Sequence, residues 1–456
     1  MKSNRIKWGL LALLLLLGAL AVGGAPAAAV SETRFIVKYR TGEDWRRKDR
    51  SLPYDLVTGA ELEGLRAADA LEWYEPDGLM ELLEGPEAGW YNSEKWDLAM
   101  IHAEAAFELG CMGQGVRIGI VDSGVNPHPA LAACLEAGRS YLEEGDPADT
   151  ADRYGHGTLV AGLIAGADEV GYYGAAPGAA LVPLKVTDGK TVLTSTVCQA
   201  IYNGIDAYHC DILNLSLGIR TESQALREAV EYAEEQGVLV VSAVGNNGNG
   251  VLYYPAAYDT VIGVGAVDMD GDVAYHSNRN ASVYLTAPGV TVLTLSQYGG
   301  VTTASGTSFA VPHVTAAAAV LRGAAGRLSP QALRELLGQT AEDRGPEGWD
   351  QSYGYGILNL EAGLLALLGQ PDPCSFLPET GPATQLRNNT DEPLEVTYLL
   401  AEYDETGVCL GVTVLPMTLP ARATAELPPP AAEGCFGQFV YETGTGSPLT
   451  RERKTP

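Results

Sequence analysis

Short apolar runs alternate with amphipathic segments through the middle of the chain. The apolar runs span residues 116–121, 180–186, 212–217, 238–243 and 261–267. Residues 222–236 instead carry apolar side chains at helical spacing. This alternation predicts buried parallel strands that are connected by helices covering both faces of the sheet. We therefore expect an α/β domain with a doubly wound, mostly parallel sheet over residues 91–370.

The segments on either side of this domain have different patterns. Phe35, Val37 and Tyr39 alternate with other residues in a strand-like run, and the proline-punctuated, charged stretch around it predicts a small α+β unit over residues 31–90. After residue 371, apolar runs separated by glycine and proline turns predict a β-sandwich-like accessory unit over residues 371–456. Its expected strands are residues 394–403, 409–417, 423–427 and 436–441.

The first 30 residues resemble a secretory signal. Lys2, Arg5 and Lys7 precede an apolar run over residues 10–22, and three alanines at 27–29 offer a cleavage site. Residues 8–30 are also long and apolar enough to remain as a membrane anchor, so this alternative stays open. We expect a secreted or extracellular protein, with association to the cell envelope as the other outcome.

Charge and cysteine content exclude several classes of function. The chain has 57 acidic and 29 basic residues, a formal net charge of -28, which opposes binding to nucleic acid. Its seven cysteines contain no CxxC pair, so a zinc ribbon is not expected. Cys198 with Cys210, or Cys409 with Cys435, could form disulfides, and free thiols are the alternative.

Three short motifs in the α/β region carry side chains suited to catalysis. Asp122 closes a predicted strand in Val-Asp-Ser-Gly, and His156 opens a predicted helix within Gly-His-Gly-Thr. Ser308 begins an alanine-rich helix within Gly-Thr-Ser-Phe-Ala-Val-Pro, at the positive end of the helix dipole. Together they provide an acid, a base and a nucleophile in the chain order Asp, His, Ser.

This order and these motifs resemble the subtilisin-like serine proteases. The resemblance implies an endopeptidase in which Asp122, His156 and Ser308 form the catalytic triad and Asn246 donates to the oxyanion. Residues 31–90 resemble an inhibitory propeptide, with self-cleavage expected between about residues 84 and 92. The resemblance also assigns substrate-binding positions to Ser216, Leu217, Gly218, Ala243, Gly245 and Tyr253.

Several expectations follow for ligands and specificity. Tyr253 falls where the floor of the primary specificity pocket is expected, which suggests a narrowed pocket for small or medium apolar side chains. No cofactor is required, and calcium is an open alternative without a matched site: the calcium loop of the family is poorly matched, and Asp268 to Asp272 fits a hairpin turn better than a calcium loop. The expected partners are peptide or protein substrates and the chain's own propeptide, and we expect a monomer. The alternative is a catalytically silent peptide-binding or scaffold protein of the same fold.

Overall fold

The computed structural model describes most of the chain. The described residues are 34–41, 52–83, 95–167, 172–325, 328–368, 374–376, 384–388, 393–403, 409–427, 435–442 and 453–455. The predicted signal segment lies outside these ranges. Within them, no helix combines the length and the apolar character needed to cross a membrane.

The first compact unit ends at Asp77 and contains a three-stranded antiparallel sheet in the order β2-β1-β3. Thr58 and Glu61 form a capping box at the start of its helix, in which each side chain accepts from the other's backbone N–H. Val37, Tyr39 and Leu62 belong to its separate small core. The elements are β1 (Arg34–Tyr39), β2 (Asp55–Thr58), α2 (Gly59–Ala67) and β3 (Leu71–Pro76).

The second unit is built on a seven-stranded parallel sheet in the order β13-β12-β11-β9-β5-β7-β6. Its strands are β5 (Arg117–Asp122), β6 (Arg139–Ser140), β7 (Ala180–Lys185), β9 (Ile212–Leu215), β11 (Leu239–Ala243), β12 (Val261–Val267) and β13 (Leu285–Pro288). The strand order reverses direction between β5 and β9, which is where doubly wound sheets form a crevice at the carboxyl ends of their strands. The predicted fold class is confirmed.

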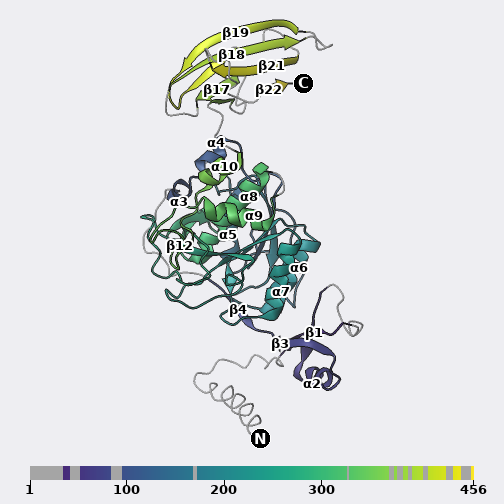
Figure 1. Ribbon diagram of the computed structural model, residues 1–456. Coiled ribbons are helices and arrows are strands. Elements are labelled where there is room, and N and C mark those ends of the chain that lie inside the picture. Colours follow the sequence, from purple (N-terminus) through teal and green to yellow (C-terminus); the bar gives the residue numbers. More distant parts are fainter. Residues whose placement is uncertain are drawn as a thin grey trace. The chain divides into compact units, whose positions relative to one another are not determined.

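Helices pack on this sheet in two groups (Figure 1). One group contains α5 and α8, which pack on each other, and α8 also lies against β9, β11, β12 and β13. The other contains α6 and α7, which pack together and cover β5, β7 and β11. The helices are α3 (Trp96–Met100), α4 (Glu104–Glu108), α5 (His156–Ala165), α6 (Thr194–Asp206), α7 (Gln224–Glu235), α8 (Thr307–Ala325), α9 (Pro330–Gln339) and α10 (Leu360–Leu368), with a short 3-10 turn at Pro129–Leu131.

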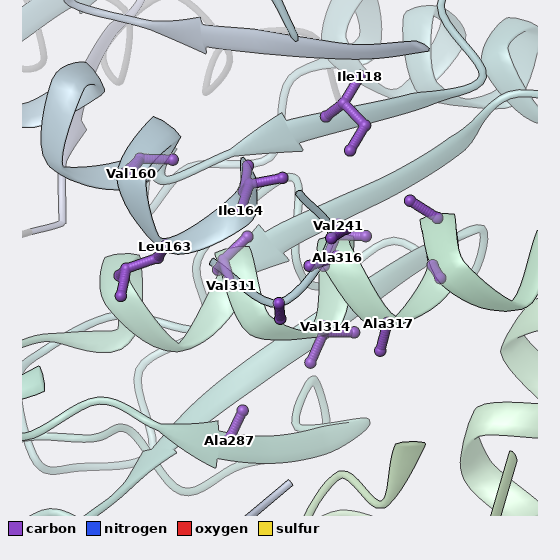
Figure 2. Packing of buried hydrophobic residues seen from close by; sticks show 14 of the residues in the cluster. Ile118, Val160, Leu163, Ile164, Val241, Ala287, Val311, Val314, Ala316 and Ala317 are labelled. Carbon is purple, nitrogen blue, oxygen red and sulfur yellow. The ribbon is translucent and has the colours of Figure 1, made fainter. Parts of the chain in front are cut away.

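The long helix α8 passes through the centre of the hydrophobic core. Figure 2 shows Val311, Val314 and Ala316 of this helix among side chains from α5 and the sheet, including Ile164 and Val241. Fifteen residues of α8 are buried, and many of them are alanines whose small side chains let the helix approach its neighbours closely. This packing holds the first turn of α8 in place, and Ser308 lies on that turn.

A second, three-stranded sheet in this unit contains a strand from the N-terminal part of the chain. Strand β4 (Leu79–Leu82) lies between β8 (Thr191–Leu193) and β10 (Leu217–Gly218) and is antiparallel to both. Two further strands, β14 (Val292–Leu295) and β15 (Val301–Ala304), form a hairpin before α8. β4 therefore has sheet neighbours on both sides, more than a hundred residues further along the chain.

The C-terminal strands form two further antiparallel sheets, in the orders β16-β17-β20 and β19-β18-β21-β22. Leu386, Tyr398 and Leu419 belong to a core of their own. The elements are β16 (Cys374–Phe376), β17 (Thr384–Asn388), β18 (Leu394–Tyr403), β19 (Cys409–Leu419), β20 (Thr424–Leu427), β21 (Cys435–Glu442) and β22 (Arg453–Thr455). These sheets agree with the β-sandwich-like unit expected after residue 371.

The described cysteines do not form the first of the two disulfides considered. Cys210 carries a free, buried thiol, so it is not bonded to Cys198. Burial raises the pKa of the Cys210 thiol to about 12, which keeps it protonated and unreactive at neutral pH. The side chains of Cys409 and Cys435 lie outside the described residues, so that pairing stays a prediction.

Candidate active site

The three predicted catalytic side chains stand at the ends of regular elements. Asp122 is the last residue of β5, His156 is the first residue of α5, and Ser308 is the second residue of α8. All three residues are buried. Because β5 ends at the carboxyl edge of the sheet beside the point where the strand order reverses, Asp122 stands at the position where doubly wound folds hold their ligands.

The carboxylate of Asp122 holds the imidazole ring of His156. Nδ1 of His156 lies 2.8 Å from one carboxylate oxygen and 2.9 Å from the other. The backbone N–H of Ser123 also donates to Asp122 at 2.7 Å, which orients the carboxylate. The ring of Phe309, the residue after Ser308, lies 5.3 Å from the His156 ring between centroids. These contacts turn Nδ1 towards the acid, and Nε2 is on the opposite side of the ring.

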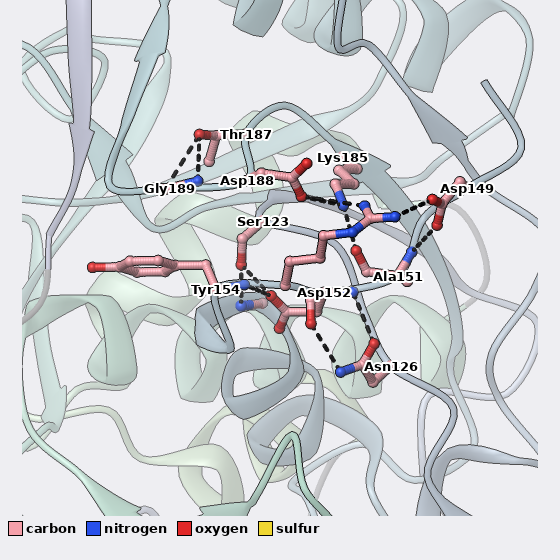
Figure 3. A network of polar contacts seen from close by, with 12 residues as sticks. Ser123, Asn126, Asp149, Ala151, Asp152, Tyr154, Lys185, Thr187, Asp188 and Gly189 are labelled. Carbon is pink, nitrogen blue, oxygen red and sulfur yellow. Dashed lines mark hydrogen bonds and ion pairs between the residues drawn. The ribbon is translucent and has the colours of Figure 1, made fainter. Parts of the chain in front are cut away.

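A buried carboxylate, Asp152, organises the turn that presents His156. Figure 3 shows Asp152 in a polar network with Ser123 and Asn126. Its Oδ2 accepts from the backbone N–H and the hydroxyl of Thr158, at 2.8 and 2.7 Å. Its Oδ1 accepts from Gly155 N–H at 2.6 Å and from the hydroxyl of Ser123 at 2.8 Å. Asp152 thus satisfies N–H groups at the start of α5 and links that start to the residue after Asp122.

Gly155, which precedes the helix, has a φ of 107°, a conformation that favours glycine. A residue with a Cβ would be strained at this turn, so the backbone conformation explains the glycine. The neighbouring side chain of Gln297 also lies within 2.4 Å of where that Cβ would stand.

The hydroxyl of Ser308 is in contact with a carbonyl group from the N-terminal part of the chain. Its Oγ lies 2.5 Å from the carbonyl oxygen of Leu83 and 3.0 Å from that of Ser216. Leu83 directly follows β4, and its own N–H donates to the Ser216 carbonyl at 3.2 Å. The strand β4 therefore delivers one particular carbonyl group to the predicted nucleophile.

Asn246 approaches the same carbonyl oxygen. Its Nδ2 donates to the oxygen of Leu83 at 2.5 Å, while its Oδ1 accepts from the backbone N–H of Thr307 at 2.9 Å. Because an N–H can only donate, the Thr307 contact fixes which end of the amide faces the carbonyl. The residue before the predicted nucleophile thus orients the predicted oxyanion donor, an arrangement that can stabilise negative charge on that oxygen.

The predicted substrate-binding backbone lies beside β4. Leu217 is paired with Leu82 and Gly218 with Glu81, and the Ser216 carbonyl accepts from Leu83. On the other side of β4, the N–H of Leu82 donates to the carbonyl of Lys190 at 2.9 Å. An extended peptide in this position is held by main-chain hydrogen bonds to two strands.

Tyr253 is almost fully buried, with its ring between two glycines. A Cβ at Gly218 would lie 3.1 Å from the ring and 3.3 Å from the side chain of Leu83, and a Cβ at Gly245 would lie 2.6 Å from the ring. The ring and the side chain of Leu83, a medium-sized apolar residue, thus both lie against Gly218. Ala243 is placed differently, since it is the last residue of β11 and pairs with Val264 within the central sheet.

Comparison with known protein families matches residues 113–356 to the subtilase family. The match covers more than half of the chain and includes Asp122, His156, Asn246 and Ser308. The chain belongs to the subtilase family. It is therefore a subtilisin-like serine endopeptidase, a hydrolase.

Individual subtilases are similar to more than half of the chain. The chain is 38% identical to Subtilisin BL of Lederbergia lenta over 275 residues, which are 59% of this chain and 98% of that protein. It is also 38% identical to the minor extracellular protease Epr of Bacillus subtilis (strain 168) over 279 residues, 59% of this chain. This second match spans only 42% of Epr.

Sequence reasoning did not identify Asp152 or Leu83 as residues of this region. The sequence did contain one sign of Asp152, because an aspartate four residues before His156 stands at a predicted helix start.

The loop after β12, which contains the aspartates 268, 270 and 272, closes as a tight turn: Asp268 N–H donates to the Asp272 carbonyl at 3.0 Å. Across the described ranges no three His, Cys, Asp or Glu side chains are grouped so as to hold a metal ion.

Proposed function

We propose that this subtilase is a secreted serine endopeptidase that hydrolyses peptide bonds through Asp122, His156 and Ser308 and processes its own precursor. The observation that carries the proposal is the carbonyl oxygen of Leu83, which lies 2.5 Å both from Oγ of Ser308 and from Nδ2 of Asn246. These two contacts support the roles of Ser308 as nucleophile and Asn246 as oxyanion donor, because both side chains meet one peptide carbonyl at the end of an extended strand.

In the proposed mechanism, His156 removes the proton of the Ser308 hydroxyl as its oxygen attacks the carbonyl carbon. Asp122 keeps the imidazole in the required tautomer and stabilises its charged form. Negative charge develops on the carbonyl oxygen, and Asn246 donates to it. His156 then protonates the leaving amine. In the second half, His156 takes a proton from water as the water oxygen attacks the acyl carbon, and it gives that proton to Oγ of Ser308 as the acid product is released. These steps need no cofactor.

Applied to the precursor, the same mechanism cleaves the bond between Leu83 and Glu84. This bond lies just before the window of residues 84–92 expected from the sequence. The released segment occupies the position of a substrate strand, so we propose that the propeptide inhibits the enzyme until it leaves. We also propose export through residues 1–30, with peptides or proteins as substrates and a monomeric enzyme.

The test is to express the full-length chain as wild type and as Ser308→Ala. The wild type should react with a fluorophosphonate probe and release a propeptide whose last residue is Leu83, as measured by mass spectrometry. Ser308→Ala should remain unlabelled and uncut. A matched control is Ser296→Ala, since Ser296 lies in an exposed turn where its hydroxyl accepts from Tyr298 N–H.

Two results would contradict the proposal. A wild-type chain that neither reacts with the probe nor cleaves peptides would instead be a silent peptide-binding protein. Normal processing of Ser308→Ala would show that Ser308 is not the nucleophile for maturation.

A further inference from the structure

The strand β4 identifies which side chains of a bound peptide meet which part of the enzyme. Counting back from the bond to be cleaved, Leu83 is the first residue, Leu82 the second and Glu81 the third. Side chains alternate between the two faces of an extended strand, so those of Leu83 and Glu81 point to the same side. On that side lies Tyr253, whose ring lies against Gly218, as does the side chain of Leu83.

The hydroxyl of Tyr253 extends from this ring to the third residue. It donates to the carboxylate of Glu81 at 3.2 Å and accepts from Nε of Arg220 at 2.8 Å. The guanidinium carbon of Arg220 lies 5.5 Å from the centroid of the same ring. One aromatic residue thus borders the first substrate position and, through its hydroxyl, contacts the third.

The direction of this hydrogen-bond chain determines what it can bind. An arginine side chain only donates, so the Tyr253 oxygen accepts from Arg220 and directs its single proton to the substrate. Burial raises the pKa of the Tyr253 phenol, and Glu81 acts in the same direction, although the hydrogen bond from Arg220 opposes them. The phenol therefore keeps its proton at neutral pH and remains a donor. Only an acceptor completes the chain, and a carboxylate is the best one because it also attracts the guanidinium.

The backbone holds Arg220 and Tyr253 in this arrangement. Ile219, directly before Arg220, and Tyr254, directly after Tyr253, exchange two backbone hydrogen bonds at 2.9 and 2.8 Å. The two segments are thus tied together beside β10, where Gly218 pairs with Glu81. The donor pair is therefore positioned by main-chain contacts that do not involve β4.

We propose that Arg220 and Tyr253 form an acid-selective subsite for the third substrate residue before the cleaved bond. The preferred substrates are peptides with Glu or Asp at this position and a leucine-sized apolar residue at the first. The proposal rests on the proposed function, because it assumes that a bound substrate occupies the position of β4. It adds a specificity that the catalytic residues alone do not provide.

The first test measures the contact within the full-length chain and needs no catalysis. In the Ser308→Ala background, we compare Glu81→Lys, Arg220→Glu and the two combined by hydrogen exchange of the segment containing the Leu82 and Leu83 amides. Each single change places like charges together and should speed exchange by about fivefold, whereas the combination should restore slow exchange. Effects that simply add in the double variant would overturn the proposal.

The second test measures substrate choice by the enzyme matured from the full-length chain. The probes are internally quenched peptides Gly-Leu-Met-X-Leu-Leu-Glu-Gly, copied from residues 78–85, with Glu, Gln or Lys at X. Wild type should have a kcat/KM for the Glu peptide about five- to tenfold above that for the Lys peptide, with Gln between them. Arg220→Glu should reverse the order of Glu and Lys, and Tyr253→Phe should reduce the preference for Glu over Gln.

The control is Arg344→Glu, which changes the net charge equally at an exposed arginine paired with Glu342. It should keep the wild-type ratio of Glu to Lys peptide. Equal cleavage of the three peptides by wild type would overturn the subsite and leave the proposed function standing. Charge coupling in the first test without any peptide cleavage would contradict the proposed function and leave the contact between Arg220, Tyr253 and residue 81 standing.

Discussion

Asn246, the proposed oxyanion donor, is oriented by a backbone group that lies near it in the fold. Its Oδ1 accepts from Thr307 N–H, so its Nδ2 is directed at the carbonyl oxygen of Leu83. The amide is oriented before any substrate arrives, because the Thr307 contact belongs to the enzyme itself. Donors fixed in this way stabilise a developing charge without reorganising during the reaction.

Replacing Asn246 by Asp distinguishes the donor role of its amide nitrogen from the acceptor role of its amide oxygen. The carboxylate keeps an acceptor for Thr307 N–H but cannot donate, so kcat should fall by about 100- to 1,000-fold with a smaller change in KM. Steady-state peptide hydrolysis measures both values. The matched control is Asn249→Asp, in the same loop, where the side-chain oxygen accepts from Val251 N–H and can still do so. An equal loss of rate in both variants would point to the added charge instead of the lost donor.

The candidate site residues that lie in short sequence motifs could be predicted from the sequence. The residues that contact them from distant parts of the chain could not. Asp122, His156, Asn246 and Ser308 each lie in a local pattern of small residues that can be read without knowing the fold. Leu83 lies 225 positions from Ser308, and nothing in its local sequence indicates that contact. Arg220 and Tyr253 likewise meet only because Ile219 and Tyr254 pair across the fold.

At the level of elements, the start of α5 depends on one buried carboxylate. Asp152 accepts from Gly155, Thr158 and Ser123, so its loss leaves several buried donors without an acceptor. Asp152→Ala should lower the free energy of unfolding by about 3 kcal/mol and also reduce kcat/KM, because His156 lies within the disturbed turn. Urea unfolding in the Ser308→Ala background, which prevents self-digestion, measures the first effect.

The neighbouring Asp149 offers a matched control for this experiment. It lies in the same loop, but its carboxylate pairs with Arg153, and both side chains are more than a third exposed. Asp149→Ala should leave the midpoint of unfolding almost unchanged, since exposed ion pairs add little to stability. A comparable loss in both variants would show that the loop as a whole, and not the cap of α5, determines stability.

Strands and helices were predicted best where one element spans a long, uniform pattern. The runs at residues 261–267 and 394–403 coincide with β12 and β18, and the predicted helix 222–236 contains α7. The pairing of the short strands β4 and β8 was not predicted. Each has only three or four residues, and their pairing depends on contacts between distant parts of the chain, which hydrophobic periodicity does not reveal.

For the whole molecule, buried titratable groups make stability depend on pH. The side chain of His276 is buried without a hydrogen-bond partner among the described residues, and burial lowers its pKa to about 4. Asp97 is also buried. Burial acts to raise its pKa, but the Lys95 ammonium and the hydrogen bond from His313 together lower it to about 2. His313 is thus a packed residue that contacts Asp97.

These shifts act in successive pH windows. His276 takes up a proton more readily in the unfolded chain, whose pKa is about 6.5, so stability should fall as pH decreases from about 6.5 towards 4. The loss should be on the order of 2 kcal/mol by pH 4.5. Below the unfolded value of 3.8, protonation of Asp97 removes further stability as pH approaches 2.

Urea unfolding of Ser308→Ala between pH 7.5 and 4.5 measures the first window. The same chain with His276→Leu should lose clearly less stability over that range, because it has no proton to take up there. An unchanged pH dependence in His276→Leu would show that other groups cause the loss. The Asp97 window lies at lower pH, so it does not interfere with this comparison.

The position of β4 between β8 and β10 has a consequence for the proteins that this enzyme can degrade. Any chain that replaces β4 must lie fully extended and offer both of its main-chain edges for several residues in succession. A segment already folded into a helix or a sheet cannot do so without first unfolding. The rate of cleavage should therefore depend on how easily a protein unfolds locally. Tightly folded proteins should be cut slowly even where their sequences fit the enzyme.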